Sequence, residues 1–218
     1  MDDNDVIVIN DLNEILSIPI DKLTSLQHLT FGYWFNQPLS NNLDKLTSLQ
    51  YLTFGQCFNR PLSNSLDKLT PLKCLSFGYR FNQPLTNSLD TLTSLWQLTL
   101  GYNFNQQLDL PLNIKYLVLD CNNQNIIDNL HNNIEELTLS YNFNLEMNNL
   151  PSSIKKIIIK NKNYNKKLNN LPIYVDYICL PIYYEEKILN SPKNLKKIKC
   201  NKNYKFINDF SDCKVSFY

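Results

Sequence analysis

Residues 26–48, LQHLTFGYWFNQPLSNNLDKLTS, return almost unchanged as residues 49–71, LQYLTFGQCFNRPLSNSLDKLTP. The same 23-residue interval carries the dipeptide Phe-Asn through four copies, which begin at Phe35, Phe58, Phe81 and Phe104. All four glycines of the chain keep this interval, at Gly32, Gly55, Gly78 and Gly101. A fixed period in the twenties is typical of a solenoid, in which one small unit is stacked many times. We therefore predict a repeat protein without a single central core.

A second pattern places apolar residues at positions 1, 4 and 6 of each unit. The nine triplets begin at Leu26, Leu49, Leu72, Leu95, Ile114, Ile134, Ile154, Val175 and Leu195. The last two apolar residues of a triplet are two positions apart, which is the spacing of side chains on one face of a strand. The pattern predicts a right-handed coil resembling leucine-rich repeats, with a parallel sheet of about nine short strands on its concave face.

The segments that return to the next strand change along the chain. Early segments carry leucines at helical spacing, such as Leu39, Leu43 and Leu46. From Leu100 onward the interval shortens to 19–21 residues, and Pro111, Pro151, Pro172 and Pro192 each stand three places before the next triplet. Proline favours an extended path. We expect a convex side of short helical or 3₁₀ turns early in the chain and mostly extended backbone later.

The asparagine after each phenylalanine predicts a structural ladder. Each solenoid turn leaves backbone amides and carbonyls at its corners, and buried polar groups must be paired. An asparagine side chain offers both donors and an acceptor, so a column of asparagines can bridge consecutive coils. The predicted ladder residues are Asn36, Asn59, Asn82, Asn105 and Asn144.

These motifs resemble a known family. A strand triplet followed by Gly-x-x-Phe-Asn-x-Pro-Leu, as in residues 32–39 and 78–85, is similar to the FNIP subclass of leucine-rich repeats. The resemblance covers about residues 20–200 and is clearest in the first four units. It implies a leucine-rich-repeat fold, an origin in amoebae or in giant viruses of amoebae, and frequent fusion to an F-box. It implies no catalysis.

The predicted organisation has three parts: an N-terminal cap at 1–22, FNIP-type repeats at 23–200 and a C-terminal cap at 201–218. The stretch from Leu12 to Leu16 is similar to the opening of an F-box, but Asn13 stands where proline is expected. About twenty residues are too few for a three-helix F-box. We favour a cap over the first coil, because terminal repeats need a covering element. A degenerate F-box remains the alternative.

Composition favours a folded protein with two differently charged ends. Apolar residues make up 43% of the chain, and the net charge is +1. Residues 1–154 carry 7 Lys/Arg against 15 Asp/Glu, whereas residues 155–218 carry 14 lysines against 5 acids. The 33 asparagines fit a chain with many turns, although coding bias in an A/T-rich genome would raise asparagine as well.

The remaining signals indicate a monomer in the cytoplasm of its cell or of a host cell. The chain begins with acidic residues rather than a basic secretory signal, and no apolar run approaches the roughly 18 residues needed to cross a bilayer. The six cysteines show no metal-type spacing, so we expect reduced thiols, no metal and no cofactor.

Outward positions on and just beyond the strands are the candidate partner-binding residues. Tyrosine provides a large, stiff contact area, so columns of exposed tyrosines can act as interaction hot spots. The candidates are Tyr33, Tyr51, Tyr79, Tyr102, Tyr116 and Tyr141, together with Lys156, Lys197 and Lys199 near the basic end. The alternative interpretation is that Tyr33, Tyr79 and Tyr102 stack on one another as part of the repeat.

Three functional hypotheses follow. The leading one is a protein–protein interaction module that binds an unknown partner on the concave face. The second is substrate recognition for a ubiquitin ligase through a degenerate F-box. The third is weak, non-specific binding of an acidic polymer or nucleic acid by the lysine-rich coils, against the alternative that these lysines are only solvated. We do not expect an enzyme, because no nucleophile motif or phosphate-binding loop is present.

Overall fold

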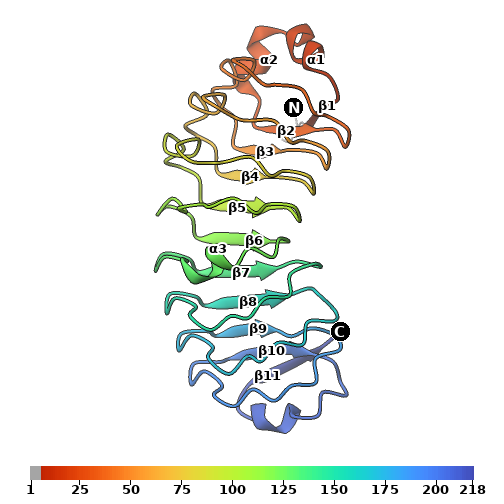
Figure 1. Cartoon of the computed structure of the whole chain (residues 1–218), viewed down its shortest axis with the longest axis vertical. Coiled ribbons are helices and arrows are strands. Elements are labelled where there is room, and N and C mark those ends of the chain that lie inside the picture. Colours follow the sequence, from red (N-terminus) through yellow and green to blue (C-terminus); the bar gives the residue numbers. More distant parts are fainter. Residues whose placement is uncertain (1–5) are drawn as a thin grey trace. The chain divides into compact units, whose positions relative to one another are not determined.

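The structure is a computed structural model that describes residues 6–218, in two compact units divided between Ile114 and Lys115. The acidic start at residues 1–5, which belongs to the predicted cap 1–22, lies outside the described residues. Each unit is a stack of coils with one strand per coil (Figure 1). Within each unit, every strand pairs in parallel with the next one along the chain.

The first unit contains two short helices and five strands. Its elements are β1 (Val6–Ile9), α1 (Leu12–Ser17), α2 (Ile20–Ser25), β2 (His28–Phe31), β3 (Tyr51–Thr53), β4 (Cys74–Ser76) and β5 (Gln97–Leu100). The strands keep a constant register, so that Leu29 faces Leu52, and Leu52 faces Leu75.

The second unit contains six strands, one α-helix and one 3₁₀ turn among its described residues. Its elements are β6 (Tyr116–Leu119), α3 (Gln124–Asp128), β7 (Glu136–Leu139), β8 (Lys156–Ile159), β9 (Tyr177–Cys179), β10 (Lys197–Cys200), η1 (Ile207–Phe210) and β11 (Lys214–Phe217).

The parallel strands confirm the predicted fold class, but the described residues hold eleven strands rather than nine. The nine triplets account for β2 to β10. The two additional strands, β1 and β11, pair with β2 and β10. Neither is preceded by an apolar residue at the first triplet position, so the repeat pattern does not reveal them. A neighbouring strand supplies their hydrogen bonds instead.

The segment preceding the first repeat is fastened to it by side-chain hydrogen bonds. Asp11 caps α1, and Ile15 of that helix is buried. Gln37 of the following coil donates to Asp11 Oδ2 at 2.8 Å and accepts from the Leu12 amide at 2.9 Å. The stretch from Leu12 to Leu16, considered above as an F-box remnant, therefore forms a single six-residue helix held against the stack.

Stacked phenylalanine rings fill the first unit. Phe31, Phe54 and Phe77 lie one above another with ring centroids 5.1 and 5.3 Å apart. The phenylalanines of the Phe-Asn dipeptides form a second column, with centroid spacings of 5.9 to 6.1 Å. Within a coil the two columns touch, as at Phe77 and Phe81, 3.9 Å apart. Identical side chains at identical coil positions thus build a continuous core.

Tyrosine replaces this second phenylalanine column in the later coils. Tyr164, Tyr184 and Tyr204 are buried, and each hydroxyl donates to a carbonyl of the preceding coil. The acceptors are Leu145, Lys166 and Glu186, at 3.1, 3.0 and 2.8 Å. Burial raises the pKa of each of these hydroxyls, which therefore remain neutral donors.

The asparagines of the Phe-Asn dipeptides connect successive coils. The backbone amide of Asn59 donates to Asn36 Oδ1, that of Asn82 to Asn59 Oδ1, and that of Asn105 to Asn82 Oδ1, each at 2.9 Å. In the second unit the Asn144 amide donates to Asn122 Oδ1 at 2.8 Å. Asn36, Asn59 and Asn82 thus each accept the amide of the asparagine one repeat later.

Glycine directly after the strand permits close approach of the next coil. A Cβ atom at Gly78 would overlap the carbonyl oxygen of Gly55 and would lie 2.7 Å from the Cα atom of Gln56. Backbone cannot move aside as a flexible side chain can. The glycine column is therefore needed for the stacking distance of the coils.

Between β2 and β10 the return segments follow the predicted change, with one exception; the 3₁₀ turn η1 lies beyond them, before β11. In the first unit they consist of turns with bonds between residues three apart, such as the Leu69 amide to the Leu66 carbonyl at 2.9 Å. Later, the Pro151 carbonyl accepts from the Ile154 amide at 3.3 Å, and the other three repeat prolines make the same turn. The exception is α3, where adjacent Ile126 and Ile127 both reach the core from one helical turn.

We predict that Gly78→Ala lowers the free energy of unfolding by about 1–3 kcal/mol, because the new methyl group must displace the neighbouring coil. Urea unfolding followed by circular dichroism measures the change. Asn103→Ala, in an exposed turn of the same unit, serves as the control and should change stability by less than about 0.5 kcal/mol. A Gly78→Ala protein as stable as the control variant would contradict the close-approach explanation.

We further predict that Asn82→Ala costs about 1–3 kcal/mol, because the Asn105 amide loses its acceptor and the Gln106 side chain keeps only the Asn82 backbone carbonyl. Asn82→Asp keeps an oxygen acceptor and should recover most of this loss. The same unfolding experiment compares the two variants. Equal losses would show that the ladder bond does not carry the effect.

Candidate functional site

The outward side chains of the strands form what we call the strand face of each unit. In the first unit it carries two columns that continue across the parallel register. One contains His28, Tyr51, Cys74 and Gln97, and the other contains Thr30, Thr53, Ser76 and Thr99. His28 and Tyr51 stack with ring centroids 4.3 Å apart and planes 3° from parallel. This face has no acidic or lysine side chain on β2 to β5, so it offers aromatic and hydroxyl contacts rather than charge.

A row of exposed aromatic rings borders this face, in the turns that follow β2, β4 and β5. We call it the turn row; its members are Tyr33, Trp34, Tyr79 and Tyr102, which are 57, 76, 44 and 39% exposed. Tyr79 and Tyr102 stack on each other at 4.8 Å, as the repeat interpretation expects. Tyr33 instead meets Trp34 edge-on at 4.6 Å.

The strand face of the second unit is charged. Its first column contains Tyr116, Glu136, Lys156, Tyr177, Lys197 and Lys214, one from each of β6 to β11. The Lys156 ammonium binds Glu136 at 2.8 Å and lies 5.9 Å from the centre of the Tyr177 ring. Lys197 approaches the same ring at 5.3 Å.

A further lysine–tyrosine contact lies in the second column of this face, which contains Val118, Thr138, Ile158, Cys179, Lys199 and Ser216. Lys199 on β10 lies 4.6 Å from the ring centre of Tyr218. The Tyr218 hydroxyl donates to the Leu180 carbonyl and lies 3.1 Å from Cys179 Sγ. The C-terminal tyrosine is thus held over β9 and β10.

The row just before these strands has alternating charges that neutralise one another. Glu135 binds Lys155 at 2.8 Å and Lys115 at 3.1 Å, and Asp176 binds Lys196 at 3.8 Å. Hydrogen bonds from the two lysines hold the pKa of Glu135 below its usual value. Opposite charges on neighbouring strands stabilise the stack at this row.

The structure thus separates the candidate partner residues into groups. It brings together Tyr79 and Tyr102, and it brings Lys156 and Lys197 to one ring. It does not place Tyr33 against Tyr79, and Tyr51 is engaged with His28. Tyr116 lies on β6, and Tyr141 is exposed in the turn after β7.

Three aromatic contacts were not among the sequence candidates. Trp34 has no aromatic counterpart one repeat later, where Cys57 stands, so it belongs to no repeated aromatic column. Tyr218 follows a strand that the triplet pattern does not mark. Tyr177 could have been chosen, because lysines occupy its repeat position in the coils on either side.

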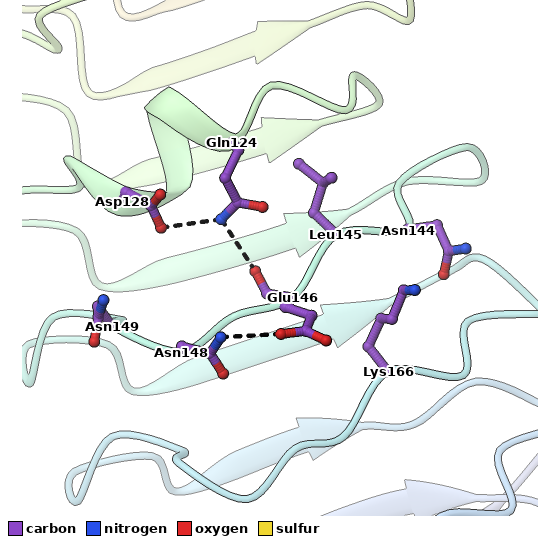
Figure 2. A pocket seen from close by; sticks show the side chains of 8 residues that line it. All are labelled: Gln124, Asp128, Asn144, Leu145, Glu146, Asn148, Asn149 and Lys166. Carbon is purple, nitrogen blue, oxygen red and sulfur yellow. Dashed lines mark hydrogen bonds between the residues drawn. The ribbon is translucent and has the colours of Figure 1, made fainter.

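A hollow of about 440 Å³ lies beside α3 on the return side of the second unit (Figure 2). Gln124 donates to Asp128 at 2.9 Å, and Asn148 donates to Glu146 at 3.1 Å. Figure 2 shows that Gln124 also reaches the backbone carbonyl of Glu146, which joins α3 to the segment of the next coil. We assign no reaction to it.

We identify no candidate metal site or reactive thiol in the described part of the chain. Among residues 6–218, no group of three or more His, Cys, Asp or Glu side chains is placed to hold a metal ion. All cysteines within this range are free, and burial raises the pKa of Cys121 to about 11, which disfavours a thiolate nucleophile. No helix of the described chain has the length and apolar character to cross a bilayer.

Short parallel strands, one per coil, with leucine-rich inner positions define a leucine-rich-repeat solenoid. Residues 122–162 match the family model described as FNIP Repeat. This match supports an FNIP-type leucine-rich-repeat protein. The match lies in the second unit, although the clearest Phe-Asn repeats are in the first.

Two solved structures are similar to this chain. CroV588, a giant-virus protein whose structure is described as a novel circular LRR protein, is 30% identical, with a TM-score of 0.69. That alignment covers 88% of this chain but only 30% of CroV588, so this chain spans about three-tenths of its length. An internalin, InlF, from Listeria monocytogenes strain 4b F2365 is 16% identical, with a TM-score of 0.55, covering 94% of this chain and 72% of the internalin. The internalin supports the fold alone. No curated protein sequence matches.

Proposed function

We propose that this protein is an interaction module that binds a partner protein on its strand face and the adjoining turns. Repeat folds of this type commonly serve as protein-interaction scaffolds and are generally not enzymes. The observation that carries the proposal is the turn row, in which four large aromatic side chains are exposed along the edge of one strand face.

The turn row lies outside the packed interior of the coils. The inner leucines and phenylalanines already form the core, and the ladder asparagines already connect the coils. Tyrosine and tryptophan are enriched among residues that dominate binding energy. In the second unit, Lys156, Lys197 and Lys199 are the candidate partner-binding residues of that unit's own strand face.

The proposal includes no catalytic step and no cofactor. Its site of action is the cytoplasm of a cell or a host cell, where unpaired thiols such as the free cysteines of this chain persist. We propose a monomeric module whose specificity comes from the side chains of the strand face and the turn row, because the repeat leaves these positions variable.

The test is capture of a partner by the full chain. The double variant Tyr79→Ala/Tyr102→Ala should lose a captured partner by at least about tenfold, as expected for loss of hot-spot tyrosines. Tyr174→Ala is the control, because Tyr174 is also exposed, at 56%, but lies in the turn before β9. Quantitative mass spectrometry of the bound fraction measures the loss.

Capture of the same proteins in the same amounts by all three forms would contradict a role for the turn row. Circular dichroism of each variant establishes that the coils remain folded. A partner lost equally from the double variant and from Tyr174→Ala would also count against the proposal, since it would indicate non-specific adhesion.

A further inference from the structure

We propose that the strand face of β8 to β11 binds a protein segment rich in aspartate and glutamate. This inference rests on the proposed function, because it names the partner chemistry of one part of the same face. The surface consists of Lys156, Tyr177, Lys197 and Lys214, with Lys199 and Tyr218 beside them; we call it the lysine–tyrosine surface.

The register places these residues in one line. Lys156 faces Tyr177, Tyr177 faces Lys197, and Lys197 faces Lys214 across successive parallel strands. Neighbouring strands lie about 4.8 Å apart, so three ammonium groups share a line of about 15 Å. An extended peptide crossing the strands could place carboxylates against all three.

Positive charge on this surface is only partly neutralised by the protein itself. Lys156 has Glu136 as its acid partner, whereas Lys197, Lys199 and Lys214 have no ion pair among the described residues. The adjacent row differs, because there Glu135 and Asp176 alternate with lysines. Balanced charge in one row beside unbalanced charge in the next fits a surface whose acidic partner is external.

The tyrosines hold the lysines in place. Two ammonium groups approach the Tyr177 ring from the strands on either side, at 5.9 and 5.3 Å, and a third lies 4.6 Å from the Tyr218 ring. These cation–π contacts keep like charges close together and restrict long, flexible side chains. A restricted ammonium loses less conformational freedom when a carboxylate binds.

The same contacts favour carboxylates over nucleic acid. Single-stranded nucleic acids bind by stacking bases on exposed aromatic faces, but lysines from the two neighbouring strands occupy the surroundings of the Tyr177 ring. The second unit contains no arginine, the side chain that most often reads guanine bases. A compact ammonium is a suitable partner for a carboxylate.

The test uses the full chain and a fluorescein-labelled 12-residue peptide of alternating glutamate and aspartate. Fluorescence anisotropy measures its dissociation constant in 50 mM and 200 mM NaCl. We expect Lys197→Glu/Lys199→Glu to weaken binding at least tenfold in 50 mM salt. Lys167→Glu/Lys193→Glu, which makes the same charge change at exposed return-segment lysines, should weaken it less than threefold.

Equal weakening by both double variants would overturn the inference, since net charge alone would then explain binding. The second outcome concerns a 12-nucleotide uridine strand. If it binds more tightly than the peptide and also depends on Lys197 and Lys199, the partner is nucleic acid and not an acidic protein segment. Absence of peptide binding to the wild-type chain in 50 mM salt would overturn it directly.

The outcomes separate this inference from the proposed function. If the turn-row variant loses its partner but the peptide does not bind, the interaction module stands and the acidic partner class is wrong. If the peptide binds through Lys197 and Lys199 while the turn-row variant keeps all partners, the turn row has no role in partner binding. The lysine–tyrosine surface then remains as the binding site.

Discussion

The hydrogen bond from a backbone amide of one coil to the asparagine side chain of the coil before it is the constraint on which the structure depends. Asn82 shows both roles: its amide donates to Asn59, and its side chain accepts from Asn105. A coil removed from its neighbours would leave these groups unpaired and its phenylalanines exposed. Stability therefore arises between coils rather than within them.

This dependence explains which positions can vary. Inner positions must repeat, because phenylalanine stacks on phenylalanine and glycine must admit the next backbone. Outward side chains contact only solvent and the side chains of neighbouring strands, so they can differ from coil to coil. Hence β2 and β3 carry a His28–Tyr51 stack, whereas β8 to β10 carry lysines around Tyr177. The repeated interior supports two chemically different faces.

The sequence predicted much of the interior and less of the surface. Leu29, Leu52 and Leu75 could be assigned inward from spacing alone, because a repeated pattern reports a repeated environment. The strands β1 and β11 escaped prediction because their neighbours, not their own spacing, determine them. Trp34 and Tyr218 were missed since neither recurs, and helix α3 arose where two adjacent isoleucines reach the core. Contacts between non-repeated side chains require coordinates.

Native-state hydrogen exchange of the ladder amides tests the central claim most directly. The account predicts that the amide protons of Asn59, Asn82, Asn105 and Asn144 exchange as slowly as those of the adjoining strands, because each is bound by the preceding coil. Exchange of these four protons at the rate of an unstructured chain, while the strand amides stay protected, would contradict it.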